Sequence, residues 1–269
     1  MAVTDKRTAA IRRELLAVER QEQKLAQGAG KSSPIPWRAA LEAKVPAKVY
    51  TGLENAFAKG FSLVFQQGRT LIEKTYRKED LQNDHAIRDY AVQLKGRRKE
   101  LKHLQRGAIK SDSMNLAVTT LEGVGLGFLG VGMPDILLFL ATLLRGIYET
   151  ALNYGFDYET KQEQLLILNM MEASLSTGAA WVKKNQDVDA LLHARSTEIS
   201  DAQFQKQLQN TSAAFATDML LLKFIQGIPV VGILGGAANP VYYQRVLRYV
   251  RLKYRKRYLE MQRTTISSC

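Results

Sequence analysis

Residues 122–145, EGVGLGFLGVGMPDILLFLATLLR, join a glycine-rich apolar segment to a helix that is almost entirely apolar. Five of the ten residues from 123 to 132 are glycine, and Asp135 carries the only charge between residues 123 and 144. Proline suits the first turn of a helix and an acid suits its positive end, so we expect a helix over residues 134–153. Its apolar surface is wider than one stripe, which predicts that most of this helix is buried.

A second segment of the same design occupies residues 224–240, FIQGIPVVGILGGAANP, and also leads into a helix. Two similar segments in one chain indicate architecture rather than a single phosphate-binding loop. Gly125, Gly127 and Gly130 match the spacing of a dinucleotide fingerprint, but no strand precedes them and the helix starts too late. Three alternatives stay open for these segments: the core of a soluble helical domain, shallow membrane insertion, and a true membrane span.

The rest of the chain is predicted to be helical, with almost no strand-like alternation outside residues 228–233. We expect a mainly α fold, in which one multi-helix domain, residues 37–262, follows a basic N-terminal helix and linker (1–36) and precedes a tail (263–269). The two glycine-rich segments should pack at its core, and helix 134–153 should lie against the helices at 159–183 and 202–226. Further helices are expected at 4–27, 37–79, 84–106 and about 240–262, with a mobile polar connection at 184–201.

Net charge is the most unusual property of the composition. The 269 residues carry a formal charge of +12, which suits a polyanionic partner such as nucleic acid or an anionic bilayer. The only cysteine is Cys269, and the three histidines show no metal-ligand spacing, so we predict neither a metal nor a cofactor. The charged N-terminus lacks the apolar core of a secretory signal, which favours the cytoplasm.

Two clusters of bases are candidate membrane- or anion-binding residues. The first lies in the helix at 84–106 and the second follows the second glycine-rich segment, where tyrosines are interleaved with the bases; tyrosine favours the membrane–water interface. Positions 245, 248, 251 and 255 follow three-to-four spacing and should share one face. The candidates are Arg97, Arg98, Lys99, Lys102, Arg245, Arg248, Arg251, Lys253, Arg255, Lys256 and Arg257.

Three acids near the apolar segments are candidate catalytic residues: Asp135, Glu149 and Asp157. Asp135 and Glu149 share a helix, but fourteen residues separate them by ~21 Å, so they cannot act together on one bond. We favour structural roles for both. Asp135 suits the helix N-terminus, and Glu149 is expected to pair with Arg145 across one turn.

The two glycine-rich blocks and the residues between them also carry a family resemblance. Its motif positions are Gly125, Gly127, Gly130, Pro134, Asp135, Glu149, Tyr154, Gly155, Gly227, Pro229, Gly232, Gly235, Gly236 and Asn239. In order and spacing, residues 40–260 resemble the EcsC family. That bacterial family is named after an operon that also encodes an ABC exporter. The resemblance implies a cytoplasmic or membrane-associated accessory protein, and it implies no reaction, cofactor or catalytic residue.

The leading hypothesis is therefore a non-enzymatic accessory protein, peripheral to an anionic membrane, that binds lipid or assists an ABC exporter. A first alternative is an enzyme that acts on a lipid or another apolar substrate through the acids near the glycine-rich segments. A second alternative is a nucleic-acid-binding module, which ranks lower because no recognised nucleic-acid motif is present. The sequence does not indicate an oligomeric state.

Overall fold

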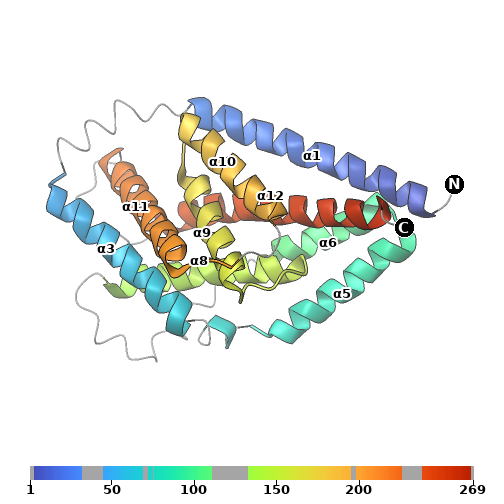
Figure 1. Cartoon of the computed structure of the whole chain (residues 1–269), viewed down its shortest axis with the longest axis horizontal. Coiled ribbons are helices and arrows are strands. Elements are labelled where there is room, and N and C mark those ends of the chain that lie inside the picture. Colours follow the sequence, from blue (N-terminus) through green and yellow to red (C-terminus); the bar gives the residue numbers. More distant parts are fainter. Residues whose placement is uncertain are drawn as a thin grey trace.

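A computed structural model describes residues 3–31, 45–68, 72–74, 76–110, 133–194, 198–225 and 238–267 (Figure 1). All regular structure in these residues is helical, without a strand, so the mainly α prediction is confirmed. Residues 123–132 and 226–237 lie outside the described part of the chain. Their predicted packing in the core therefore stays a prediction. The elements are α1 (Val3–Lys31), α3 (Ala47–Leu63), a π-helical turn η1 (Val64–Gly68), α5 (Lys78–Lys95), α6 (Arg98–Lys110), α8 (Met133–Asn153), α9 (Lys161–Leu175), α10 (Gly178–His193), α11 (Asp201–Ile225) and α12 (Ala238–Ser267).

Helix α8 begins and ends within one residue of the predicted bounds. Its window Ile136–Asn153 is long and apolar enough to cross a membrane, but 83% of that window is buried inside the protein. The burial predicted from its wide apolar surface is therefore present. Two residues after the end of α8 comes Gly155, which has a φ of +80°. The amides of Gly155 and Phe156 donate to the carbonyls of Leu152 and Ala151, which is the hydrogen-bond pattern of a Schellman cap.

The packing partners of α8 differ from the expected ones. It packs mainly against α12, α5 and α3, and it meets α11 where Phe139 lies edge-on to Phe215. Direct packing of α8 on α9 was expected. Instead, α12 contacts both α8 and α9. Gly146 allows the close crossing of α8 and α12, because a Cβ atom there would lie 2.7 Å from the Tyr243 hydroxyl oxygen.

Two predicted helices are each divided by a glycine. The helix expected at 84–106 is α5 and α6, separated at Gly96, and the helix expected at 159–183 is α9 and the start of α10, separated before Gly178. Both glycines have positive φ, 57° and 58°, a region that side chains disfavour. The mobile connection predicted at 184–201 is wrong for residues 184–193, because α10 continues to His193. Polar residues of this segment, Lys184 and Asp189 among them, bind to neighbouring helices.

Helix α1 belongs to the same helical assembly. It lies along α12 and also contacts α10, α6 and α5 (Figure 1). Ile11, Glu14 and Val18 are buried in these contacts. Residues 1–36 were expected to stand apart from the helical domain, whereas the described part of that segment contributes to its core.

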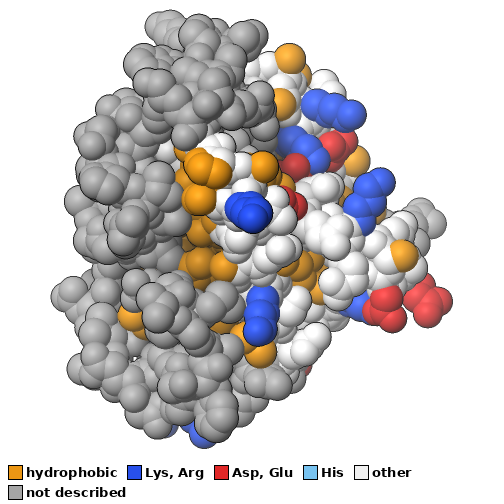
Figure 2. Space-filling model, turned by 90° about the vertical axis from the view of Figure 1, so that its left-hand side faces the viewer, with side chains coloured by type: hydrophobic (Ala, Val, Ile, Leu, Met, Phe, Trp, Pro, Cys, Tyr) orange, Lys and Arg blue, Asp and Glu red, His pale blue; other side chains and the backbone are white. Residues whose placement is uncertain are grey.

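The end of the molecule at the left of Figure 1 is mixed in character. Figure 2 shows hydrophobic side chains of the described residues on this face. Lysine and arginine side chains are scattered among them and do not gather into a patch on this face.

Candidate functional site

The Tyr158 hydroxyl lies at the centre of a polar cluster beside the turn between α8 and α9. It donates a hydrogen bond to Glu73 Oε1 at 2.7 Å and lies 2.7 Å from the Tyr76 hydroxyl. Its ring stacks on Tyr148 with the centroids 4.0 Å apart, and Lys78 Nζ lies 4.9 Å from the centroid of the Tyr158 ring. Burial raises the pKa of Tyr158, and the hydrogen bonds with Tyr76 and Glu73 raise it further. This phenol therefore stays protonated and serves as a donor.

Lys78 joins this cluster to the candidate acid Asp157. Its Nζ lies 2.5 Å from Glu159 Oε1 and 3.7 Å from Asp157 Oδ1. Burial alone lowers the pKa of Lys78, but the hydrogen bond with Glu159 and the charge of Asp157 outweigh it and leave the pKa raised. Asp157 also accepts the Glu159 amide and is exposed. These contacts are those of a salt-bridged turn.

Glu149 is buried and pairs with Arg145, whose Nε lies 2.8 Å from Glu149 Oε1. The predicted pairing across one helical turn is confirmed. Asp135 lies in the first turn of α8, but its side chain is outside the described part. The structure thus brings Asp157 to Lys78 and Glu149 to Arg145. Among the described residues, no three His, Cys, Asp or Glu side chains form a group that could hold a metal ion.

Glu163 organises a second buried network between α9 and α12. It accepts a hydrogen bond from the Tyr254 hydroxyl at 2.8 Å and two from Arg257 Nη1 at 2.9 and 2.8 Å. The Arg257 guanidinium also lies 4.2 Å from the centroid of the Phe156 ring. Burial raises the pKa of Tyr254, and the Glu163 charge adds to the effect. Arg257 is therefore engaged inside the protein.

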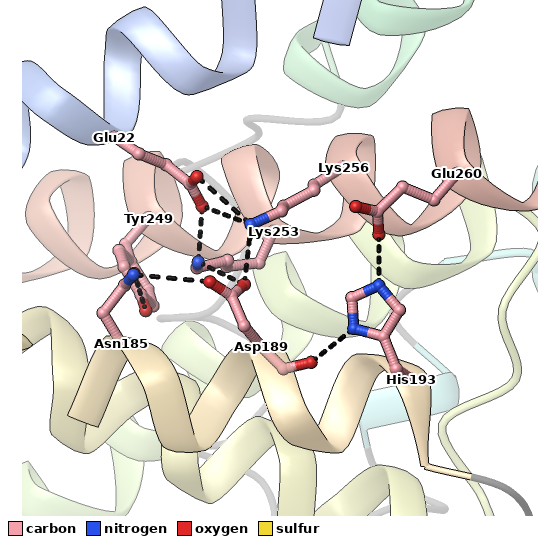
Figure 3. A network of polar contacts seen from close by, with 8 residues as sticks. All are labelled: Glu22, Asn185, Asp189, His193, Tyr249, Lys253, Lys256 and Glu260. Carbon is pink, nitrogen blue, oxygen red and sulfur yellow. Dashed lines mark hydrogen bonds and ion pairs between the residues drawn. The ribbon is translucent and has the colours of Figure 1, made fainter. Parts of the chain in front are cut away.

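Two further bases of α12 lie between α1 and α10 (Figure 3). Lys253 is 0% exposed, and its Nζ lies 2.5 Å from Glu22 Oε1 and 2.7 Å from Asp189 Oδ1. Lys256 Nζ lies 3.2 Å from Glu22 Oε2 and 3.0 Å from Asp189 Oδ1. Burial lowers the pKa of Lys256, but the hydrogen bond with Asp189 and the charge of Glu22 together raise it. Two lysines and two carboxylates thus bind three helices together.

The other bases of α12 differ in their exposure and in their partners. Arg245 bonds to Asp218 at 3.0 Å, and Arg255 bonds to Glu14. Arg248 is exposed and Arg251 is half-buried. The helix therefore does not present its bases as one exposed cationic face. On α12, five of the candidate anion-binding residues have carboxylate partners: Arg245, Lys253, Arg255, Lys256 and Arg257.

Helix α6 presents a cationic face. Leu101, Leu104 and Ala108 are buried on its inner side. Every exposed side chain from residue 98 to residue 108 belongs to a basic residue type, and Arg97 just before the helix is exposed too. Arg98 is bonded to Glu14 of α1. The exposed residues of this face are Arg98, Lys99, Lys102, His103 and Arg106.

A match to a protein-family model decides which family the chain belongs to. The model of the EcsC protein family matches residues 9–259 of the 269. The chain belongs to the EcsC family. No curated protein and no solved structure matches it. The EcsC match begins within α1 and so includes a helix that the sequence resemblance, over residues 40–260, left out.

Of the positions that carry the sequence resemblance, Glu149, Tyr154 and Gly155 lie at the C-terminal end of α8. Tyr154 is buried and its ring lies 6.1 Å from that of Tyr258, while Gly155 lies against His85. Pro134, Asp135 and Asn239 are helical, but their side chains are not described. The remaining motif residues lie outside the described part: Gly125, Gly127, Gly130, Gly227, Pro229, Gly232, Gly235 and Gly236.

Sequence reasoning missed the acids that neutralise α12. Glu14 lies 241 residues before its partner Arg255, so no local spacing rule connects the two. One signal was present in the sequence. Glu14 falls between Ile11 and Val18 at three-to-four spacing, so an acid stands on the apolar face of α1. A buried acid needs a buried cation, and α12 is rich in cations.

Proposed function

We propose that this EcsC-family chain is a non-enzymatic accessory protein that associates peripherally with an anionic membrane surface through α6. The observation that carries the proposal is the all-basic exposed face of that helix. Each lysine or arginine near an anionic leaflet contributes about 1 kcal/mol of attraction. Lys99, Lys102 and Arg106 together therefore supply about 3 kcal/mol, and the net charge of +12 adds long-range attraction.

The composition of this face favours a bilayer over single-stranded nucleic acid. Proteins that bind single strands interleave aromatic side chains with the bases, so that nucleobases can stack on them. The exposed positions from 98 to 108 carry no Phe, Tyr or Trp. The operon association that names the family supports a further part of the proposal, namely service to an ABC exporter at the cytoplasmic face.

Vesicle binding tests the proposed function. We expect the purified protein to bind phosphatidylcholine vesicles that contain phosphatidylglycerol, to ignore pure phosphatidylcholine, and to bind more weakly as salt rises. Replacing Lys99, Lys102 and Arg106 together by glutamine should lower the affinity by roughly a hundredfold, because about 3 kcal/mol is lost. Tight binding to single-stranded DNA in the same assay, without vesicle binding, would favour the nucleic-acid alternative.

A matched variant separates local from total charge. Lys48, Lys183 and Lys206 are exposed on α3, α10 and α11. Their joint replacement by glutamine removes the same charge as the α6 variant and should change vesicle affinity far less. A wild-type protein that stays unbound at low salt would remove the basis of the proposal.

A further inference from the structure

Helix α5 carries a stripe of exposed hydrophobic side chains toward the end that leads into α6. Ile87, Tyr90 and Leu94 are 68%, 65% and 57% exposed. Their spacing of three and four residues places them on one side of the helix, opposite the buried Val92. Single exposed hydrophobic residues are common on protein surfaces. Three in register on one helix indicate a surface that is shaped for contact.

The stripe is confined to the end of α5 that leads into α6. The same side of the helix carries the exposed polar residues Asn83 and Asp80, one and two turns before Ile87. The left-handed Gly96 follows Leu94 closely, and exposed Lys95 and Arg97 flank that glycine. The apolar stripe is thus continuous along the chain with the cationic residues of α6.

Contacts with α1 and α12 fix the hairpin that α5 and α6 form at one end of the molecule. Asp89 of α5 accepts a hydrogen bond from Gln262 of α12 at 2.8 Å, and Arg7 of α1 donates to the same Gln262. Figure 1 shows the start of α1, the end of α12 and the α5–α6 junction together at that end. Met261, beside Gln262, is a further exposed hydrophobic residue. The α5–α6 hairpin is therefore held in place by α1 and α12.

We propose that the stripe of Ile87, Tyr90 and Leu94 inserts at the headgroup level of an anionic bilayer while the α6 bases bind the lipid headgroups. This inference rests on the proposed function and adds an apolar anchor to it. Tyrosine suits the interface, and an apolar helix face flanked by bases is the usual design of an interfacial helix. Burial of these side chains in lipid gives a contribution that salt does not screen.

The size of the stripe favours a bilayer over a protein partner. The seven-residue spacing from Ile87 to Leu94 spans roughly 10 Å along the helix. A stable protein interface buries about 1,000 Å² or more, which three side chains do not supply. The adjacent positive charge complements anionic lipid directly.

The salt dependence of vesicle binding tests the anchor. We expect the wild-type protein to keep a fraction of its binding to phosphatidylglycerol-containing vesicles at high salt. The variant Ile87→Ser, Tyr90→Ser, Leu94→Ser should bind about tenfold more weakly at low salt and lose the salt-resistant fraction. Because all three side chains are exposed, circular dichroism and thermal unfolding should be unchanged. The control Leu16→Ser, Val182→Ser alters exposed hydrophobic residues of α1 and α10 and should bind as the wild type does.

The outcomes distinguish the anchor from the proposed function. Wild-type protein that ignores anionic vesicles contradicts both. Wild-type binding that the triple serine variant reproduces at every salt concentration overturns the anchor alone. A change in sedimentation without vesicles would instead identify the stripe as a self-association surface, which also overturns the anchor.

A spectroscopic probe locates the insertion directly. In a Cys269→Ser background, Leu94→Cys labelled with a polarity-sensitive dye should shift its emission to the blue on adding anionic vesicles. Val182→Cys, labelled in the same way, should not shift. An unshifted spectrum at position 94 under conditions where the protein is bound to vesicles would contradict the proposal.

Discussion

At Gly155 both the backbone and the surrounding side chains exclude a larger residue. Its φ of +80° is unfavourable for any residue with a Cβ, and a Cβ atom there would overlap the His85 ring. We expect Gly155→Ala to lower the free energy of unfolding by about 2–4 kcal/mol, because backbone strain and the clash add together. Chemical denaturation followed by circular dichroism measures this loss.

Gly178 offers a control for Gly155. Its φ is +58°, but a Cβ atom there would meet nothing within 4 Å beyond its own helix and chain neighbours. Gly178→Ala should therefore cost only the backbone contribution of about 1 kcal/mol. Adding His85→Ala to Gly155→Ala should recover the part of the loss that comes from the clash. Equal losses at the two glycines would show that His85 plays no part.

The partly buried carboxyl of Asp218 predicts a dependence of stability on pH. Burial raises its pKa above the ordinary 3.8, and Arg245 and Tyr242 offset only part of that effect. Between the pKa of Asp218 in the unfolded chain and its higher pKa in the folded protein, the folded protein binds more protons than the unfolded chain. The contribution of Asp218 to stability therefore falls as pH rises through this range. We expect the free energy of unfolding of the wild type minus that of Asp218→Asn to decrease from about pH 4 upward. A difference that rises with pH would reverse the assigned direction of the shift.

At the scale of elements, ion pairs attach α1 to α12, and Lys253 is the basic member that is completely buried. Lys253→Met leaves Glu22 and Asp189 with fewer cations in a buried site, and we expect a loss of about 3–5 kcal/mol of stability. The exposed pair Arg77–Asp80 provides the comparison, because Arg77→Met should cost about 1 kcal/mol or less. Urea denaturation midpoints compare the two variants. Equal small losses would mean that Lys253 is accessible to water.

Local rules predicted what depends on neighbours in the chain. Proline placed the start of α8, and four-residue spacing placed the pair of Arg145 with Glu149. The breaks at Gly96 and Gly178 were missed, because the amphipathic spacing resumes after each glycine. Glycine signals a turn only when it adopts positive φ, which the surrounding packing decides.

At the scale of the molecule, the sequence revealed the total charge but not its distribution. The excess of bases pointed to α12, whose bases are instead largely paired with acids from α1, α9, α10 and α11. Most of the exposed candidate anion-binding residues lie on α6. Such pairing joins residues more than two hundred positions apart, so only the fold determines which bases stay available for a partner.

Removing α1 tests whether residues 37–262 form a domain by themselves. Without α1, Arg255 loses Glu14 and Lys253 keeps only Asp189, while the contacts of Ile11 and Val18 are also lost. Burial of each such aliphatic side chain contributes about 1.5–3 kcal/mol, so their loss is a large part of the roughly 5–15 kcal/mol that stabilises a typical domain. We therefore expect a chain that starts at residue 32 to lose its cooperative thermal transition. Co-expression of residues 1–31 as a separate peptide should restore it, because the pairing surface on α12 is intact. A shortened chain that melts at the full-length temperature would show instead that α1 is an appendage and that its buried ion pairs contribute nothing net.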